Sequence, residues 1–167
     1  MKATGIVRRI DDLGRIVIPK EIRKTLMIND GDSLEIYVNN NEIVLSKYSF
    51  FNNIEVIAKK LVSVFNNIYK KKILITDKEK IIVCSKELES SYLNRNISND
   101  IKKSIIDRIE SIGNKKIVDK MEKIYLIPII VDSDAIGSII LISDLIDDND
   151  KNIIKLLSAI LIKNIEE

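Results

Sequence analysis

Hydrophobic and polar positions alternate in short runs over the first fifty residues. Two β-branched runs, 4–10 and 13–18, flank the polar pair Asp11-Asp12, which predicts two short strands joined by a turn. Pro19 suits the first turn of a helix because its missing N–H needs no partner there, and this helix should end near residue 27. Alternation returns at 33–38 and 42–48, on either side of the turn Asn39-Asn40-Asn41. The predicted order is strand, strand, helix, strand, strand.

A different pattern follows a short, stiff junction near residues 48–53. Apolar residues recur at helical spacing from 53 to 69, Ser98 is a candidate N-cap for a helix to about residue 112 with Gly113 as its stop, and acidic residues at 147–150 open a last helix. Strands are expected between these helices, at 73–76, 80–85, 116–118, 124–131 and 136–143. The pattern predicts two domains, residues 1–50 and an α/β domain at 51–167.

Composition excludes several kinds of chemistry. The chain has 167 residues, 46% hydrophobic and 31% charged, which is typical of a globular protein. It has no histidine, so a histidine general base and histidine metal ligands are excluded, and we expect no metal and no cofactor. The single cysteine, Cys84, cannot close a disulfide within the chain, and its apolar neighbours favour a buried side chain over a reactive thiol.

The size of the first domain predicts a partner. Under fifty residues with four short strands and one short helix bury little apolar surface, and domains of this size usually need a metal, disulfides or a second chain. Metal and disulfide are excluded by the composition. The sequence therefore predicts that residues 1–50 form a dimer.

Charge is divided within this first domain, although the whole chain carries only +2. Residues 1–28 hold seven basic and three acidic residues, whereas 29–48 hold one basic and four acidic residues. On a helix from Pro19, Ile22 and Leu26 share an inward side. We expect the basic residues to form a cationic face for phosphates, with arginine favouring bidentate contacts: Arg8, Arg9, Arg15, Lys20, Arg23 and Lys24. Ordinary solvated surface charge is the alternative interpretation.

One segment strengthens the nucleic-acid interpretation. The run Leu13-Gly14-Arg15-Ile16-Val17-Ile18-Pro19-Lys20-Glu21-Ile22-Arg23, with its flanks from Thr4 to Leu26 and on to Tyr48, closely resembles the AbrB/SpoVT family of transition-state and sporulation regulators. The resemblance implies a swapped-hairpin barrel in which two chains intertwine. It also implies DNA contacts at Arg8, Arg15 and Arg23, beside Arg9 and Lys24. Many family members have arginine at the position of Lys24, where lysine keeps the charge but loses bidentate geometry.

The second domain has a weaker resemblance. Its paired apolar runs, 124–131 and 134–142, are similar to paired strands of GAF domains, which the family joins to this type of N-terminal domain. The ligand-binding residues are unknown, and sensing a small molecule or stabilising the oligomer are equally open roles. The last helix is apolar around most of its girth, so it must be buried on two sides. A bundle formed with the helix at 53–69 of another copy would give a homotetramer.

The function predicted from the sequence is that of a double-stranded DNA-binding regulator of sporulation genes in the forespore, both activator and repressor. The alternative is the DNA-binding antitoxin of a toxin–antitoxin pair, which shares the swapped-hairpin domain. An enzyme is not expected, because histidine and a Gly-rich phosphate loop are both missing. No apolar run approaches the length of a membrane helix, so we expect no membrane partner and a cytoplasmic protein.

Overall fold

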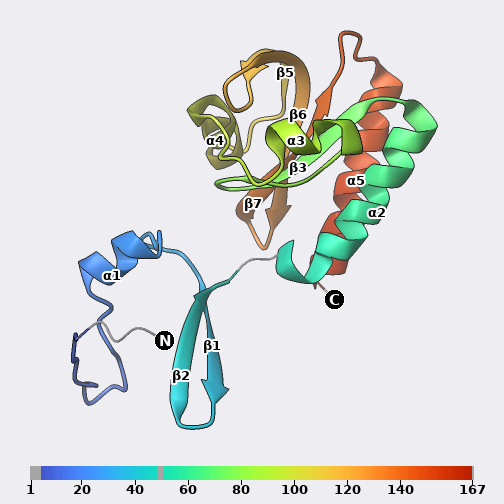
Figure 1. The fold of residues 1–167 in the computed structure, drawn as a ribbon. Helices are drawn as coiled ribbons and strands as arrows, with labels where there is room; N and C mark the ends of the chain where they lie inside the picture. The colour runs from blue at the N-terminus through green and yellow to red at the C-terminus, as the bar shows by residue number, and fades with distance from the viewer. Residues whose placement is uncertain (1–4, 49–50, 167) are drawn as a thin grey trace. The chain divides into compact units, whose positions relative to one another are not determined.

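The chain divides into two compact units, Met1–Ser49 and Phe50–Glu167, which are described separately. The computed structural model describes residues 5–48 and 51–166, with backbone alone for 51–54 and 166 (Figure 1). The domain boundary expected after residue 50 adjoins residues 49–50, which lie outside the described residues.

The first unit contains one short helix and one hairpin. Helix α1, Lys20–Thr25, begins directly after Pro19, and strands β1, Leu34–Asn39, and β2, Glu42–Lys47, pair antiparallel from Leu34 opposite Lys47 to Asn39 opposite Glu42. Asn40 has a φ of 52°, which an asparagine tolerates in a tight turn. The predicted helix and the second predicted strand pair are confirmed.

The first predicted strand pair is not formed in the single chain. Residues 5–10 and 13–18 carry no strand, and Thr4 lies outside the described residues. The turn between them is present, since the Gly14 N–H donates to the Asp11 carbonyl (2.9 Å) and the Asp11 N–H to the Arg15 carbonyl (3.0 Å). A strand needs a neighbour for its backbone groups, and β1 and β2 pair only with each other. The strand prediction was therefore wrong for an isolated chain.

The end of α1 uses a left-handed residue that is not glycine. Met27 has a φ of 52°, its N–H donates to the Lys24 carbonyl (3.2 Å), and the Ile28 N–H donates to the Arg23 carbonyl (2.8 Å). These two bonds are those of a Schellman motif, which satisfies the last carbonyls of a helix. The helix thus ends two residues before the position expected from the sequence.

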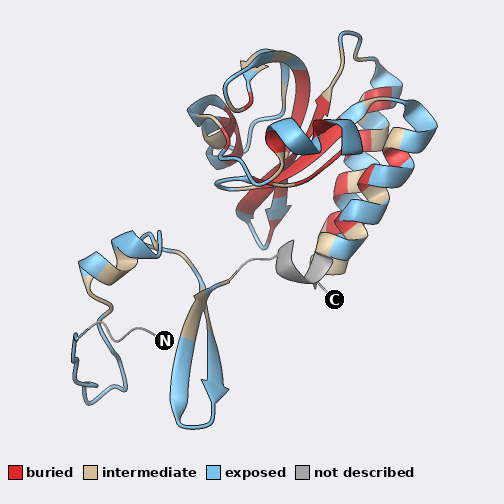
Figure 2. Ribbon diagram, viewed as in Figure 1, coloured by how far each residue is buried: buried red, intermediate tan, exposed pale blue. Residues whose placement is uncertain are grey.

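The first unit has no core of its own. Between residues 5 and 48, every residue is exposed or half-buried, and Figure 2 shows this unit without a buried segment. Ile22 is half-buried, but Leu26, expected beside it as an inward anchor, is 55% exposed. The prediction for Leu26 was wrong for the single chain, because no described element covers that side of α1.

The second unit is an α/β domain, as predicted. Its five-stranded antiparallel sheet has the order β4-β3-β7-β6-β5. The strands are β3 (Lys72–Asp77), β4 (Ile81–Cys84), β5 (Ser111–Lys116), β6 (Met121–Val131) and β7 (Asp134–Ile142). The helices are α2 (Phe51–Tyr69), the 3₁₀ turn η1 (Lys86–Leu88), α3 (Glu89–Tyr92), α4 (Asn99–Ile106) and α5 (Asp148–Glu166).

Helices cover both faces of this sheet. One core joins α2 and α5 to the face that carries Ile73 and Ile75, and a second core joins α3 and α4 to the face that carries Leu74 (Figure 1). Alternation along β3 separates the two cores, because successive strand residues point to opposite faces. Cys84 is buried in the second core, as expected.

Two sequence-based boundaries in the second unit were wrong. The Ser98 hydroxyl does accept the Ile101 N–H (3.4 Å) as an N-cap, but α4 stops at Ile106 because Arg108 takes a left-handed φ of 57°. Residues up to 116 then form β5, with Gly113 inside the strand rather than stopping a helix, and only Lys116 of the expected strand 116–118 lies in it. The short helices η1 and α3 had not been predicted.

Candidate nucleic-acid interface

Arg15 is held by the turn that precedes it. The Asp11 carboxylate accepts the backbone N–H groups of Leu13 (3.0 Å) and Arg15 (2.8 Å) on Oδ1, and Arg15 Nε (2.8 Å) on Oδ2. The backbone N–H of Arg15, and then its guanidinium, lower the pKa of the Asp11 carboxyl below its usual value. The Arg15 side chain is nevertheless 70% exposed, so a guanidinium of defined orientation faces solvent.

Arg23 has a carboxylate partner as well. From the last turn of α1 its Nη1 donates to Asp30 Oδ1 in the turn that follows the helix. Its Nε is buried and has no hydrogen-bond partner in the described part of the chain. The Asp30 side chain is almost fully exposed, so this ion pair is open to water and easily exchanged for another anion.

The other four predicted residues have no such brace. Arg8 donates only to the neighbouring Val7 carbonyl (3.2 Å), and for Arg9, Lys20 and Lys24 no carboxylate of residues 5–48 or 55–165 lies within ion-pair distance. All four are exposed. Residues 5–10 form no strand, so Arg8 and Arg9 are not held on the opposite faces of one. These cations are available for phosphate oxygens.

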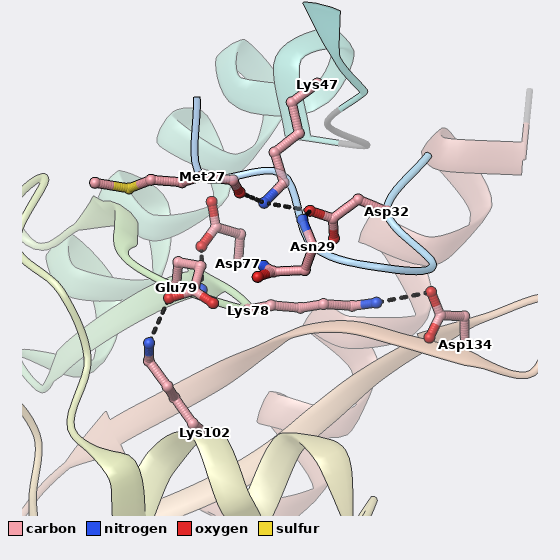
Figure 3. Close-up of polar contacts among 9 residues, drawn as sticks. All are labelled: Met27, Asn29, Asp32, Lys47, Asp77, Lys78, Glu79, Lys102 and Asp134. Carbon is pink, nitrogen blue, oxygen red and sulfur yellow. Dashed lines mark hydrogen bonds and ion pairs between the residues drawn. The ribbon is translucent and has the colours of Figure 1, made fainter. Parts of the chain in front are cut away.

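A further brace fixes the loop between α1 and the hairpin. Lys47 at the end of β2 donates to Asp32 Oδ2 (2.9 Å) and to the Met27 carbonyl (3.1 Å), as Figure 3 shows. Asp32 also accepts the Asn29 N–H (2.8 Å), which closes the turn. The acidic residues of 29–48 are thus partly structural, and Lys47 is a structural cation rather than a seventh candidate contact.

The sequence had identified the six cations but not the carboxylates that hold two of them. Asp11 was interpreted only as a turn residue, and Asp30 only as one of the four acidic residues of 29–48. The spacing of Asp11 and Arg15 across a four-residue turn was the available signal, since such a turn brings both side chains together. The six residues therefore fall into two sets, the braced Arg15 and Arg23 and the unbraced Arg8, Arg9, Lys20 and Lys24.

The second unit contains a polar cavity of about 460 Å³. Four of the six charged side chains that line it are paired with each other, Arg95 with Asp119 (2.9 Å) and Lys120 with Glu122 (2.7 Å), and Glu122 also accepts the Tyr92 hydroxyl (3.2 Å). Burial, followed by the charge of Glu122, raises the pKa of Tyr92 to about 12, so its hydroxyl stays a hydrogen-bond donor at neutral pH. This cavity is the candidate place for a small-molecule ligand in the second unit, but its ion pairs indicate no class of ligand.

Two kinds of feature are missing from the described residues. Among them, no cluster of three or more cysteine, aspartate or glutamate side chains is arranged to hold a metal ion. Nor is any of their helices both long enough and apolar enough to span a bilayer.

Two sequence families match the chain, one on each unit. Residues 7–51 match the family described as "Antidote-toxin recognition MazE, bacterial antitoxin". Residues 53–166 match the family described as "Stage V sporulation protein T C-terminal, transcription factor".

Several known proteins are similar to part or most of the chain. A methyl-accepting chemotaxis protein fragment shares the fold at 12% identity, with a TM-score of 0.56 over 68% of this chain and 88% of that one. Transition state regulatory protein AbrB of Bacillus subtilis is 60% identical over 29% of this chain and 50% of its own length. Stage V sporulation protein T of the same bacterium is 38% identical over 86% of this chain and 85% of its own. Because this last match spans both units, the chain belongs to the family of stage V sporulation protein T.

Proposed function

We propose that the chain is a transcription regulator that binds double-stranded DNA through residues 1–50 and uses residues 51–167 as a GAF-like regulatory or oligomerisation domain. The observation that carries this proposal is the set of six cations, five of them exposed and Arg23 half-buried, on a unit similar to AbrB and stage V sporulation protein T. Such a regulator acts in the cytoplasm, at the nucleoid. The family also supports a role in sporulation, as activator and repressor of forespore genes.

The proposed DNA contacts are the six cations Arg8, Arg9, Arg15, Lys20, Arg23 and Lys24. In a dimer they occur twice and could neutralise about 6–10 phosphates, which corresponds to a log–log salt slope of roughly −5 to −9. Arginine and lysine contacts to phosphate set affinity and register without reading sequence, so any sequence preference needs contacts to base edges in addition.

Dimerisation follows from the exposed apolar surface of the first unit. Val38 and Ile43 lie opposite each other across the β1–β2 hairpin and are 77% and 70% exposed. A unit without any buried described residue cannot be stable alone, because burial of apolar surface is the main stabilising term. A second copy whose 5–18 segment pairs with these elements would supply both the missing core and the missing strand partners. The swapped-hairpin dimer is therefore our proposed arrangement.

The experiment that tests the proposal is duplex binding by the full-length protein with a salt titration. Charge reversal at Arg8, Arg15 or Arg23 to glutamate should weaken binding at least about tenfold and make the salt slope shallower. The matched control is Lys60→Glu, an exposed lysine of α2 in the second unit, which should leave affinity unchanged. If the wild-type protein does not bind duplex DNA even at low ionic strength, the proposal is refuted.

An antitoxin is the second candidate, because the antitoxin family matches residues 7–51. A toxin-binding tail that folds only on its partner should be poor in apolar residues. Here the chain after residue 51 forms a sheet with two cores and matches a transcription-factor family. If a small protein encoded by a neighbouring gene co-purifies with the chain at equal stoichiometry, the antitoxin is favoured. If no such protein co-purifies, the regulator is favoured.

A further inference from the structure

The two oxygens of the Asp11 carboxylate have different tasks. Oδ1 is used by the backbone N–H groups of Leu13 and Arg15 and so closes the turn. Oδ2 is used by the Nε of Arg15 and so fixes a side chain. Closing the turn alone needs one acceptor, as asparagine or serine supplies in similar turns. The second oxygen therefore serves the guanidinium and not the turn.

This contact decides which edge of Arg15 faces outward. With Nε engaged, the two terminal nitrogens remain, and neither has a partner among the described residues. Two terminal nitrogens in a plane are the fork that contacts O6 and N7 of guanine. A free arginine loses side-chain entropy when it is ordered on a base, whereas a braced arginine has already lost part of it. The brace thus favours contacts that require a defined orientation.

The same carboxylate is unfavourable for general DNA binding. A negative charge beside a cation that meets phosphates reduces the attraction that supplies non-specific affinity. An exposed ion pair contributes little to folding stability, so stability does not explain the aspartate. Its negative charge weakens binding to every duplex, while its orientation of Arg15 strengthens binding only where the fork finds its base. Both effects raise discrimination.

We propose that Asp11 is a positioning residue that orients the Arg15 guanidinium for base recognition and thereby sets the preference of this chain for its target over other duplexes. This proposal rests on the proposed DNA-binding function. It also separates the six cations by role, since the unbraced set provides affinity for any phosphate backbone.

The test compares Asp11→Asn with Asp12→Asn in the full-length protein. Asparagine keeps an oxygen acceptor for the turn but cannot accept the Arg15 Nε–H with its other arm. Asp12 is an exposed neighbour in the same turn, with no ion pair among the described residues, so Asp12→Asn removes the same charge without touching Arg15. Two duplexes are used, one selected from a random pool by the wild-type protein and one of scrambled sequence.

Asp12→Asn should tighten binding to both duplexes by the same factor, about two- to fivefold, and leave their ratio unchanged. Asp11→Asn should tighten binding to the scrambled duplex similarly but lower the ratio of selected to scrambled affinity by about tenfold. Equal ratios for the two variants would overturn the proposal. A wild-type protein that retains no duplex from the random pool would instead overturn the proposed function.

Arg15→Lys provides a second route that leaves the Asp11 turn intact. Lysine keeps the charge but has no planar fork, so the ratio should fall as in Asp11→Asn, and combining both changes should lower it no further. Independent, additive losses would overturn the positioning role. Circular dichroism and thermal unfolding of each variant detect loss of the turn, and Arg15→Lys decides the question if Asp11→Asn does not fold.

Discussion

Among the five glycines of the chain, Gly137 is the one at which a Cβ atom would clash with neighbouring backbone. It lies in β7 between Asp77 of β3 and Ile129 of β6, and a Cβ built there would stand 1.9 Å from the Thr76 carbonyl oxygen. That atom belongs to the backbone of a central strand, so it cannot swing away. Gly137→Ala should lower the free energy of unfolding by about 2–4 kcal/mol, measured by urea denaturation.

Gly113→Ala is the matched control for this prediction. Gly113 has a φ of 142° and open space around its Cβ position, so alanine there meets backbone strain but no clash. Its cost should be about 1 kcal/mol, the low end for a residue held in a sparsely populated backbone region. If the two substitutions cost the same, the close approach of Thr76 does not restrict position 137.

Cys84 should give the protein a defined response to alkaline pH. Burial, with smaller effects from Glu89 and Glu87, raises the pKa of this thiol from 9.0 to about 11. At pH 8 about one molecule in a thousand then carries a thiolate, so alkylation of the native protein should be far slower than in denaturant. The pKa of the Cys84 thiol is higher in the folded than in the unfolded state, so its contribution to the free energy of unfolding is complete below pH 9. This contribution declines as the pH rises toward 11, because the unfolded chain then ionises first. In Cys84→Ala this part of the decline should disappear, whereas native-state alkylation at the rate of a free thiol would contradict the burial.

At the scale of elements, the start of α5 is fastened to the start of β3 by one ion pair. Lys71 Nζ contacts both carboxylate oxygens of Asp150 (2.7 and 2.6 Å), and Asp150 is almost fully buried. Asp150 and Asp147 also exchange backbone-to-side-chain hydrogen bonds of 3.0 and 2.8 Å. Lys71→Met leaves a buried carboxylate without its cation, so unfolding free energy should fall by about 2–4 kcal/mol.

The control for the α5 prediction is Lys151→Met. Lys151 pairs with Asp148, whose side chain is exposed, and such a pair contributes under about 1 kcal/mol. Both variants are compared by urea denaturation at neutral pH. Equal losses would mean that water, not Lys71, solvates Asp150.

The elements that the sequence predicted correctly are those with strong local signals. The β1–β2 hairpin follows from alternation around three asparagines, and β6 and β7 follow from long apolar runs around Asp132-Ser133. The ends of α1 and α4 were misplaced because Met27 and Arg108 adopt the left-handed conformation that usually marks a glycine. Hydrogen bonds to the preceding helix carbonyls offset the steric cost of this conformation, so residues other than glycine can adopt it. The residue types at these two positions therefore do not predict it.

The candidate site shows the same limit. Residue types and a resemblance indicate the six cations, which stay a prediction, whereas the brace on Arg15 depends on the path of the turn from Asp11. The strands expected before Pro19 failed for another reason. A single chain offers them no strand partner among the described residues and shows only the turn between them, whereas the proposed dimer would supply a partner from the second copy.

At the scale of the whole molecule, two separate apolar surfaces are exposed to solvent in the single chain. One lies on the first unit and includes Val38 and Ile43, and the other lies on α2 and includes the exposed Val64 and Ile68. Isolated exposed apolar residues are ordinary, but surfaces of this kind on both units are typical of interfaces. If each unit pairs with a different copy, the assembly closes as a homotetramer.

Two variants should dissociate the proposed tetramer, each at a different interface. Ile43→Asp opens the first-unit interface, leaving a dimer joined through α2 and α5 that has lost tight DNA binding, because the doubled set of cations is no longer held together.

Val64→Lys with Ile68→Lys opens the helical interface instead and leaves a dimer that still binds duplex. The controls Asn41→Asp and Asn67→Lys add charge at exposed polar neighbours and should stay tetrameric. Mass by analytical ultracentrifugation, with duplex binding on each species, distinguishes these outcomes. A monomeric wild type would refute both interfaces, and two variants with the same mass and the same loss of DNA binding would mean that the units do not pair independently.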